Sequence, residues 1–314
     1  MAIHITGAPC CWGVDDVRNP YLPPWQKVLY EAGQAGYKAI ELGPYGYLPL
    51  DIEVVSAELR KNGISIVAGT IFDDLLSEEN YPQVLKQVDD ICGIITKLPE
   101  LPREPGQRYK TPYLTVMDWG HDERDYAAGH PDKAPRLSEE DWQRMMEHIK
   151  GIAKAADKWG VRAVVHPPAG GYIEFADEID KLMEDIPAEV AGLCLDTGHL
   201  RYSGMEPVEW LRKYADRLDY IHFKDINEKV YTRQPAGLPP STAAPCTARK
   251  SALWAPRLPL SGLMSVLTSF LTRWKASLCA FWSAAAPISI PRHGRKTASA
   301  AATRKASLMP VPPG

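Results

Sequence analysis

Short β-rich apolar runs alternate with longer amphipathic patterns through the first 231 residues of the chain. In the longer patterns apolar side chains recur every three or four residues, which predicts helices, whereas the short runs predict strands. The seven predicted strands are Ile3–Thr6, Ala39–Leu42, Ser65–Ala68, Tyr113–Met117, Ala163–His166, Gly192–Leu195 and Tyr220–Phe223. Strands that alternate with helices indicate βαβ units, so the fold class is α/β with a parallel sheet.

Three helices and two loops stand out between the strands. The clearest helix is Gln143–Gly160, which follows an N-cap at Ser138 and an acidic first turn. The same periodicity predicts a helix over Asp177–Ile186 and another that begins at Pro207, a residue favoured at the first position of a helix. The loops are Leu98–Gly106 and His121–Arg136, of which the second is long enough to cover an active site.

Seven β/α repeats fit either a (β/α)8 TIM barrel that is one strand short or an open doubly wound sheet. No G-x-G-x-x-G loop follows any predicted strand, so a dinucleotide-binding sheet loses its main support. We therefore predict an incomplete (β/α)8 barrel, with a disordered or irregular C-terminal segment.

Charge divides the chain sharply near Tyr231. Residues 1–231 hold all 39 acidic residues and 25 of the 36 basic ones, a net charge of −14, whereas residues 232–314 hold 11 basic residues and no acidic one. We therefore expect a barrel over 1–231 and an atypical basic tail rich in Ala, Pro and Ser over 232–314. Two interpretations of this tail stay open: a disordered basic segment, or translation in a shifted reading frame, which we favour as a hypothesis. Sequencing the parent DNA distinguishes them.

Other sequence features indicate a cytoplasmic protein. No apolar run approaches the length of about 18 residues that a membrane helix needs, and the N-terminus lacks the pattern of a signal peptide. The six cysteines have neither C-x-x-C spacing nor the density of a disulfide scaffold.

Chemically active residues gather at the predicted strand ends, where a barrel places its catalytic groups. They are Glu41, His166 with the later Glu174, Asp196 with His199, and His222 with Lys224. Carboxylate and imidazole ligands suit a divalent ion such as Mn²⁺, Co²⁺ or Mg²⁺. Each residue also has a simpler interpretation: Asp196 as a helix cap, His222 as a buried core histidine, or Lys224 as half of a surface ion pair.

Sequence motifs at the predicted strand ends raise the significance of this group. LDTGH followed by YIHFKD resembles the sixth- and seventh-strand motifs of xylose-isomerase-like barrels, most closely the inosose-dehydratase-like branch. GAPCCWGVDD and AIELGPYGY are similar to the first two strands of that branch, and HPPAGGYIE to its fifth. The resemblance covers about Ala2 to Lys229.

This resemblance implies one metal ion held by a carboxylate from strand five, an Asp from strand six, a His from strand seven and a Glu from strand eight. Carried onto this sequence, Asp196 and His222 are ligands, and the strand-five position falls on His166 or Glu174, of which we choose Glu174. Glu41, His166, His199 and Lys224 are then the candidate catalytic residues. The fourth ligand has no counterpart, since no Glu follows Glu228.

The implied reaction is metal-assisted proton abstraction next to a carbonyl of a sugar or keto-polyol, as in an isomerase or epimerase. Two alternatives stay open: dehydration of an inosose, and a catalytically dead barrel that lacks the eighth-strand ligand. The sequence thus leaves open whether this chain is itself an active enzyme. A DNA endonuclease of the same fold is disfavoured by the charge of −14. We expect a small sugar or polyol as the partner, no nucleic acid and no membrane, and by analogy a homo-oligomer.

Overall fold

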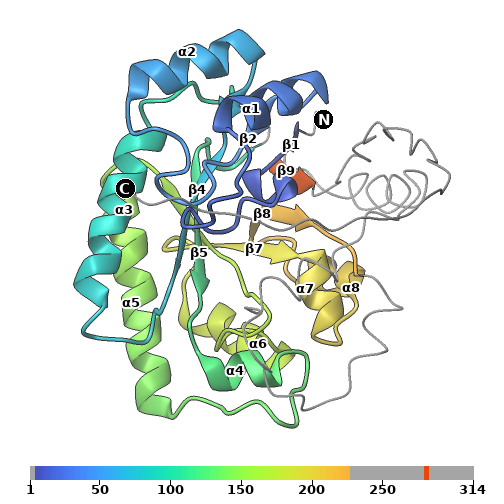
Figure 1. Cartoon of the computed structure of the whole chain (residues 1–314). Helices are drawn as coiled ribbons and strands as arrows, with labels where there is room; N and C mark the ends of the chain where they lie inside the picture. The colour runs from blue at the N-terminus through green and yellow to red at the C-terminus, as the bar shows by residue number, and fades with distance from the viewer. Residues whose placement is uncertain (1–3, 106, 227–278, 283–314) are drawn as a thin grey trace, which may run out of the picture.

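The computed structural model describes residues 4–105, 107–226 and 279–282. Its strands are β1 (His4–Thr6), β2 (Ala39–Ile40), β3 (Ser65–Ile66), β4 (Ala68–Asp73), β5 (Tyr113–Asp118), β6 (Arg162–Val165), β7 (Gly192–Asp196), β8 (Leu218–Phe223) and β9 (Cys279–Trp282). Its helices are η1 (Pro9–Trp12), α1 (Trp25–Gln34), α2 (Ile52–Asn62), α3 (Tyr81–Ile95), α4 (Asp122–Ala127), α5 (Glu139–Asp157), α6 (Ala176–Asp185), α7 (Thr197–Tyr202) and α8 (Pro207–Lys213). Figure 1 shows the helices arranged around the strands.

The strands form a closed parallel barrel. One sheet has the order β1-β9-β8-β7-β6-β5-β4, and β2 pairs with β3. A bridge between Gly7 and Ile40 joins β1 to β2. On the other side the single residue Val67 separates β3 from β4, and the amide of Leu42 donates to the carbonyl oxygen of Ala68. The two short strands and β4 thereby complete the ring.

Each of the seven predicted strands is present, with shifted bounds. The third is interrupted at Val67 and then runs on to Asp73, five residues beyond the predicted end. The predicted helix at Gln143 already begins at Glu139, because the Ser138 hydroxyl accepts a hydrogen bond from the Asp141 amide and caps it there. The predicted loop His121–Arg136 contains the short helix α4.

The eighth position of the barrel, for which the sequence predicts no strand, is held by β9. Its four residues pair with β8 on one side and with β1 on the other. Residues 227–278 and 283–314 lie outside the described residues, and so do both interpretations of the tail. Within the residues that the structure describes, no helix combines the length and the apolar character needed to cross a lipid bilayer.

Alternate strand positions face the barrel interior. A Cβ on Gly69 would meet Ile91 and Ile95 of α3, so Gly69 faces the outer helices while Ala68 and Thr70 face inward. A small core cluster fills the interior on the amino-terminal side of the candidate site. Its members on the strands are Ala39, Ala68, Tyr113, Val164, Cys194 and Tyr220. The next inward positions toward the carboxyl ends of the strands carry the candidate site.

Candidate active site

Five chemically active side chains converge at the carboxyl ends of the strands. They are Glu41 after β2, His166 after β6, Asp196 at the end of β7, His222 in β8 and Lys224 after β8. Four of the five lie two residues beyond an inward-facing member of the small core cluster. The fifth, Lys224, lies four residues beyond Tyr220, which belongs to the same cluster. Because alternate strand positions face the same side, all five side chains point into one mouth. His166 and Asp196 are each only 1% exposed.

The two oxygens of Asp196 have separate tasks. Oδ1 accepts hydrogen bonds from the amides of Gly198 and His199, at 2.9 and 3.0 Å, and so caps α7. Oδ2 faces the mouth, 2.9 Å from the Lys224 ammonium and 3.5 Å from Nε2 of His166. Nδ1 of His222 lies 3.7 Å from Oδ2, and Nε2 of His199 lies 4.0 Å from it. Asp196 is therefore both a helix cap and the centre of the cluster.

Asp196 and Lys224 each stabilise the charged form of the other. Burial alone would raise the pKa of Asp196, but Lys224 and His199 hold it well below its ordinary value. Burial would likewise lower the pKa of Lys224, which Asp196 raises instead. At neutral pH the mouth thus holds a buried carboxylate beside a buried ammonium.

His166 has a ring nitrogen whose lone pair no hydrogen bond uses within the described residues. In the described part of the chain neither of its ring nitrogens makes a hydrogen bond, although both are buried. Burial lowers the pKa of His166 to about 4, so the ring is neutral at pH 7. His166 belongs to two groups in which all ligand atoms lie within 4.8 Å of one another. One group adds Asp196 and His199, and the other adds Cys194 and His222. A neutral imidazole beside a carboxylate fits a divalent cation, and a nitrogen-rich donor set suits Zn²⁺ or Co²⁺ better than Mg²⁺.

Glu41 fixes the orientation of His222. Its Oε1 accepts a hydrogen bond from the Tyr220 hydroxyl at 2.9 Å and lies 3.1 Å from Nε2 of His222. This contact turns Nδ1 of the ring toward Asp196. Burial acts to raise the pKa of Glu41, but His222, Tyr220 and Lys224 lower it overall, so Glu41 is a carboxylate at neutral pH.

His199 is held as a hydrogen-bond donor. Its Nδ1 accepts the amide hydrogen of Ala169 at 2.9 Å, which places the proton of the neutral ring on Nε2. That N–H points toward Asp196 and the mouth. In this orientation His199 is suited to donate to a bound oxygen and less suited to coordinate a cation.

A family comparison identifies the fold. Residues 29–245 match the family model described as xylose isomerase-like TIM barrel. The chain belongs to the xylose isomerase-like TIM barrel family. Among its relatives, inosose dehydratase from Geobacillus kaustophilus (strain HTA426) is 29% identical over 237 residues, which cover 71% of this chain and 69% of the relative. Inosose dehydratase from Clostridium tetani (strain Massachusetts / E88) is 26% identical over 232 residues, with 73% and 72% covered.

Two solved structures superimpose on the chain. The IOLI protein with a bound zinc atom gives a TM-score of 0.61 at 11% identity and covers 91% of this chain and 90% of its own. L-ribulose 3-epimerase gives a TM-score of 0.57 at 15% identity, with 89% and 81% covered. At these identities the likeness shows the shared fold.

Glu174, the residue chosen from the family pattern as strand-five ligand, lies apart from the cluster. Its Oε1 accepts hydrogen bonds from the Gly129 amide and the Ser203 hydroxyl, and its Oε2 accepts one from the Gly170 amide, each at 2.7 Å. Glu174 belongs to none of the metal-ligand groups found among the described residues. Its carboxyl group joins three loops around the mouth. His166, which directly follows β6, instead lies beside Asp196; β6 is the strand that corresponds to the family's fifth.

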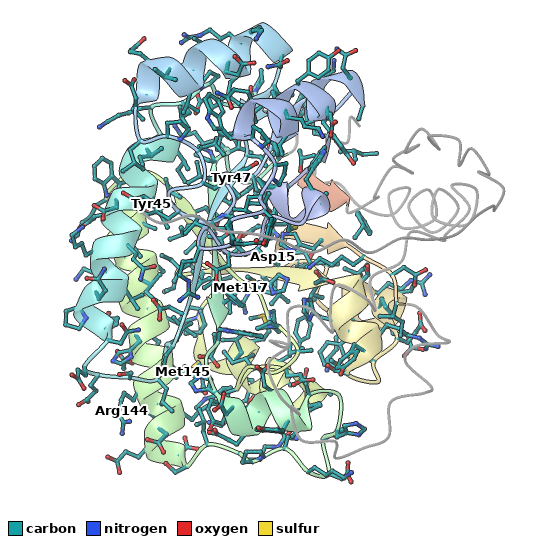
Figure 2. All side chains as sticks on the ribbon, in the orientation of Figure 1. Asp15, Tyr45, Tyr47, Met117, Arg144 and Met145 are labelled. Carbon is teal, nitrogen blue, oxygen red and sulfur yellow. The ribbon has the colours of Figure 1, made fainter. Side chains whose placement is uncertain are left out.

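Several residues near the mouth were not anticipated from the sequence. Tyr220 lies two residues before His222, and strand alternation could have identified it. Phe72 and Trp119 follow β-rich runs, but the predicted strand stopped before Phe72. Asp74, Asp118 and His121 form a further group of ligand atoms within 4.8 Å, whose carboxylates already accept backbone amides. Figure 2 draws the side chains of this region, Met117 and Asp15 among them.

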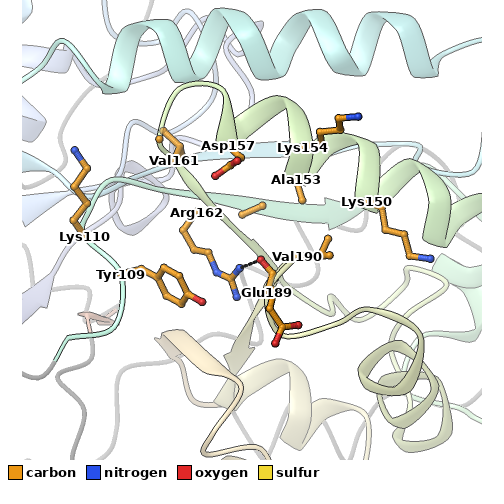
Figure 3. A pocket seen from close by; sticks show the side chains of 12 residues that line it. Tyr109, Lys110, Lys150, Ala153, Lys154, Asp157, Val161, Arg162, Glu189 and Val190 are labelled. Atoms are coloured by element: carbon orange, nitrogen blue, oxygen red, sulfur yellow. Dashed lines mark hydrogen bonds between the residues drawn. The ribbon is translucent and has the colours of Figure 1, made fainter.

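A pocket of about 500 Å³ lies at the opposite, amino-terminal end of the strands (Figure 3). Arg162 crosses it, with its guanidinium 4.1 Å from the centre of the Tyr109 ring. The same guanidinium donates to the carbonyl oxygens of Ala188 and Glu189 and lies 3.1 Å from Asp219. Arg162 therefore stabilises the loop before β7 at the end of the barrel opposite the candidate site.

Proposed function

We propose that this chain is a divalent-cation-dependent dehydratase that acts on a keto-polyol of the inosose class. The observation that carries the proposal is the convergence of Lys224, His166 and His222 on Oδ2 of Asp196 at the mouth of the barrel. Sequence relatives that are inosose dehydratases support the choice of substrate.

We assign cation binding to His166, Asp196 and His222. The three side chains come from neighbouring strand ends, and His166 contributes a neutral ring whose nitrogens have no hydrogen-bond partner in the described part of the chain. When bound, a divalent cation polarises the substrate carbonyl as a Lewis acid. Glu41 supports this set through its contact with Nε2 of His222, the arrangement by which a carboxylate commonly orients a ligating histidine.

Glu41 and Lys224 supply the acid–base chemistry in this proposal. Both contacts of Glu41 within the described residues converge on Oε1, which leaves Oε2 to take the proton from the carbon next to the carbonyl. Lys224, charged beside Asp196, donates a proton to the β-hydroxyl. The hydroxyl leaves as water, and the electron pair of the broken C–H bond forms the carbon–carbon double bond.

Epimerisation or isomerisation, the reaction first expected from the sequence, is the second candidate. It shares proton abstraction next to the carbonyl but returns the proton to the other face or to the neighbouring carbon. The positions of Glu41 and His199 favour it, because they follow β2 and β7, which are not neighbours in the barrel and thus reach the mouth from different sides.

One experiment separates these reactions. The purified chain is incubated with 2-keto-myo-inositol in D₂O, with and without added Co²⁺, and followed by proton NMR. Dehydration gives a product that has lost water, whereas epimerisation gives deuterium at the carbon next to the carbonyl with the formula otherwise unchanged. If neither change occurs with or without Co²⁺, both proposed reactions of this substrate are overturned, which favours the remaining hypothesis of a catalytically dead barrel without an eighth-strand carboxylate.

A further inference from the structure

An aromatic residue stands exposed on the inner face of the barrel. Gly69 and Ile71 of β4 face the outer helices, so Ala68, Thr70 and Phe72 face inward. Phe72 is the last inward residue of the strand, and it is 40% exposed. An apolar ring left open at the end of a barrel strand lies where such barrels bind their substrates.

A second aromatic ring extends this surface. Met117 is paired in register with Phe72 on β5, and Trp119 follows as the next inward position beyond the strand. The Trp119 amide donates to the carbonyl oxygen of Asp73 at 3.0 Å, which continues the ladder past the end of β5. The Trp119 and Phe72 ring centres lie 4.7 Å apart, with 32° between the ring planes. We call Phe72 and Trp119 the aromatic wall.

The aromatic wall adjoins the metal-ligand cluster. The His166 amide donates to the carbonyl oxygen of Val116 at 2.9 Å, which places His166 beside Met117 on the inner face. Adjacent strands are about 4.8 Å apart, so Phe72 stands roughly 10 Å from His166 around the mouth. The mouth therefore has an uncharged arc on β4 and β5 and a charged arc on β6, β7 and β8.

We propose that the aromatic wall packs against the carbon face of a ring-form polyol and selects it over an open-chain one. This inference rests on the proposed function. A six-membered ring whose hydroxyl groups are mostly equatorial presents its axial C–H groups on two flat faces, which pack well on an aromatic ring. An open-chain polyol presents no continuous apolar face, so it gains little from the same wall. Phe72 and Trp119 are thus specificity-determining residues for the cyclic substrate.

The test compares two inert polyols of similar size, myo-inositol as the ring and sorbitol as the open chain. Their affinities are measured by calorimetry in the presence of Co²⁺ for the wild type, Phe72→Ala and Phe72→Leu. Phe72→Leu keeps an apolar side chain of similar bulk and removes only the flat ring, so it guards against a folding defect in Phe72→Ala. Tyr30→Ala is the matched control, because Tyr30 is a 53% exposed aromatic residue on α1.

We expect the wild type to prefer myo-inositol, and both Phe72 variants to lose about 5- to 10-fold in myo-inositol affinity with sorbitol affinity unchanged. Tyr30→Ala leaves both affinities as they are. Myo-inositol affinity within twofold of wild type in both Phe72 variants, or an equal loss for sorbitol, overturns the aromatic wall while leaving the proposed function standing. A wild type that binds neither polyol overturns the proposed substrate class and this inference together.

Discussion

The ammonium of Lys224 lies 2.9 Å from Oδ2 of Asp196, the same carboxylate oxygen that faces three imidazole rings. A cation built into the chain is therefore paired with the oxygen that we assign to cation binding. The pair keeps a buried carboxylate charged without any ligand, because Lys224 lowers the pKa of Asp196. The chain can thus hold its site together before a metal binds.

The first prediction concerns competition for this oxygen. Replacing Lys224 with Met removes the ammonium, so we expect Co²⁺ to bind about tenfold more tightly by calorimetry. Turnover in the same variant falls by roughly 10²-fold or more, since the proposed acid is gone. Lys213→Met is the control, because Lys213 makes an exposed ion pair with Asp180 on the outside of the barrel. Weaker Co²⁺ binding by Lys224→Met would show that the ammonium supports the cation site.

A second prediction asks which residue is the strand-five ligand. Glu174→Gln replaces one acceptor oxygen of a carboxyl group that joins three loops, so we expect a loss of about 2–3 kcal/mol in the free energy of unfolding. Its Co²⁺ affinity changes less than threefold. His166→Ala, in contrast, loses Co²⁺ binding by at least tenfold.

Urea unfolding and calorimetry on the two variants provide the comparison, with Glu184→Gln on the exposed face of α6 as the control. Loss of Co²⁺ binding in Glu174→Gln, with binding retained in His166→Ala, would reverse the assignment.

Strand alternation carried most of the site prediction. Asp196, His222 and Lys224 directly end or follow runs that are apolar and β-rich, so their place at the mouth follows from the strand itself. Glu174 is different, because seven residues of irregular backbone lie between it and His166, and nothing in its sequence spacing gives the direction of that loop. Which side chain such a loop returns to the mouth depends on tertiary hydrogen bonds to Gly129 and Ser203.

Two other features could not be predicted for similar physical reasons. Gly69 weakens the β pattern after Ala68, so the third strand was expected to end before Phe72. The strand continues because β5 pairs with it along its whole length, a contact across more than forty residues of sequence. β9 lies in a segment of unusual composition, and its place is set by pairing with β1 and β8.

The third prediction follows from the neutral state of His166. Burial lowers its pKa to about 4, whereas an unfolded histidine has its ordinary value near 6.5. Between these values the unfolded chain takes up a proton that the folded chain does not. Stability from this residue is therefore present above about pH 6.5 and is lost as the pH falls toward 4, by up to about 3 kcal/mol.

Urea unfolding of the wild type and His166→Gln at pH 7.5 and pH 5, in the presence of a chelator, measures this difference. We expect the wild type to lose more stability than the variant between the two pH values. Equal losses would mean that His166 accepts its proton readily in the folded chain.

His121 leads to a fourth prediction with the opposite sign. Burial acts to lower its pKa, but the contact between its Nε2 and Oδ1 of Asp118, at 2.9 Å, raises the pKa overall. The ring also lies 4.5 Å from that of Tyr172, whose amide donates to Asp118. A raised pKa in the folded chain means that the contribution of His121 to stability is fully present well below pH 6.5. It is lost as the pH rises through the pKa of the folded chain.

His121→Gln should therefore reduce the free energy of unfolding by about 1 kcal/mol more at pH 6 than at pH 9. Urea unfolding of this variant beside His166→Gln tests both signs in one series, because the two substitutions should change the slope of stability against pH in opposite directions. Slopes that change in the same direction would show that the Asp118 contact does not hold the proton on His121.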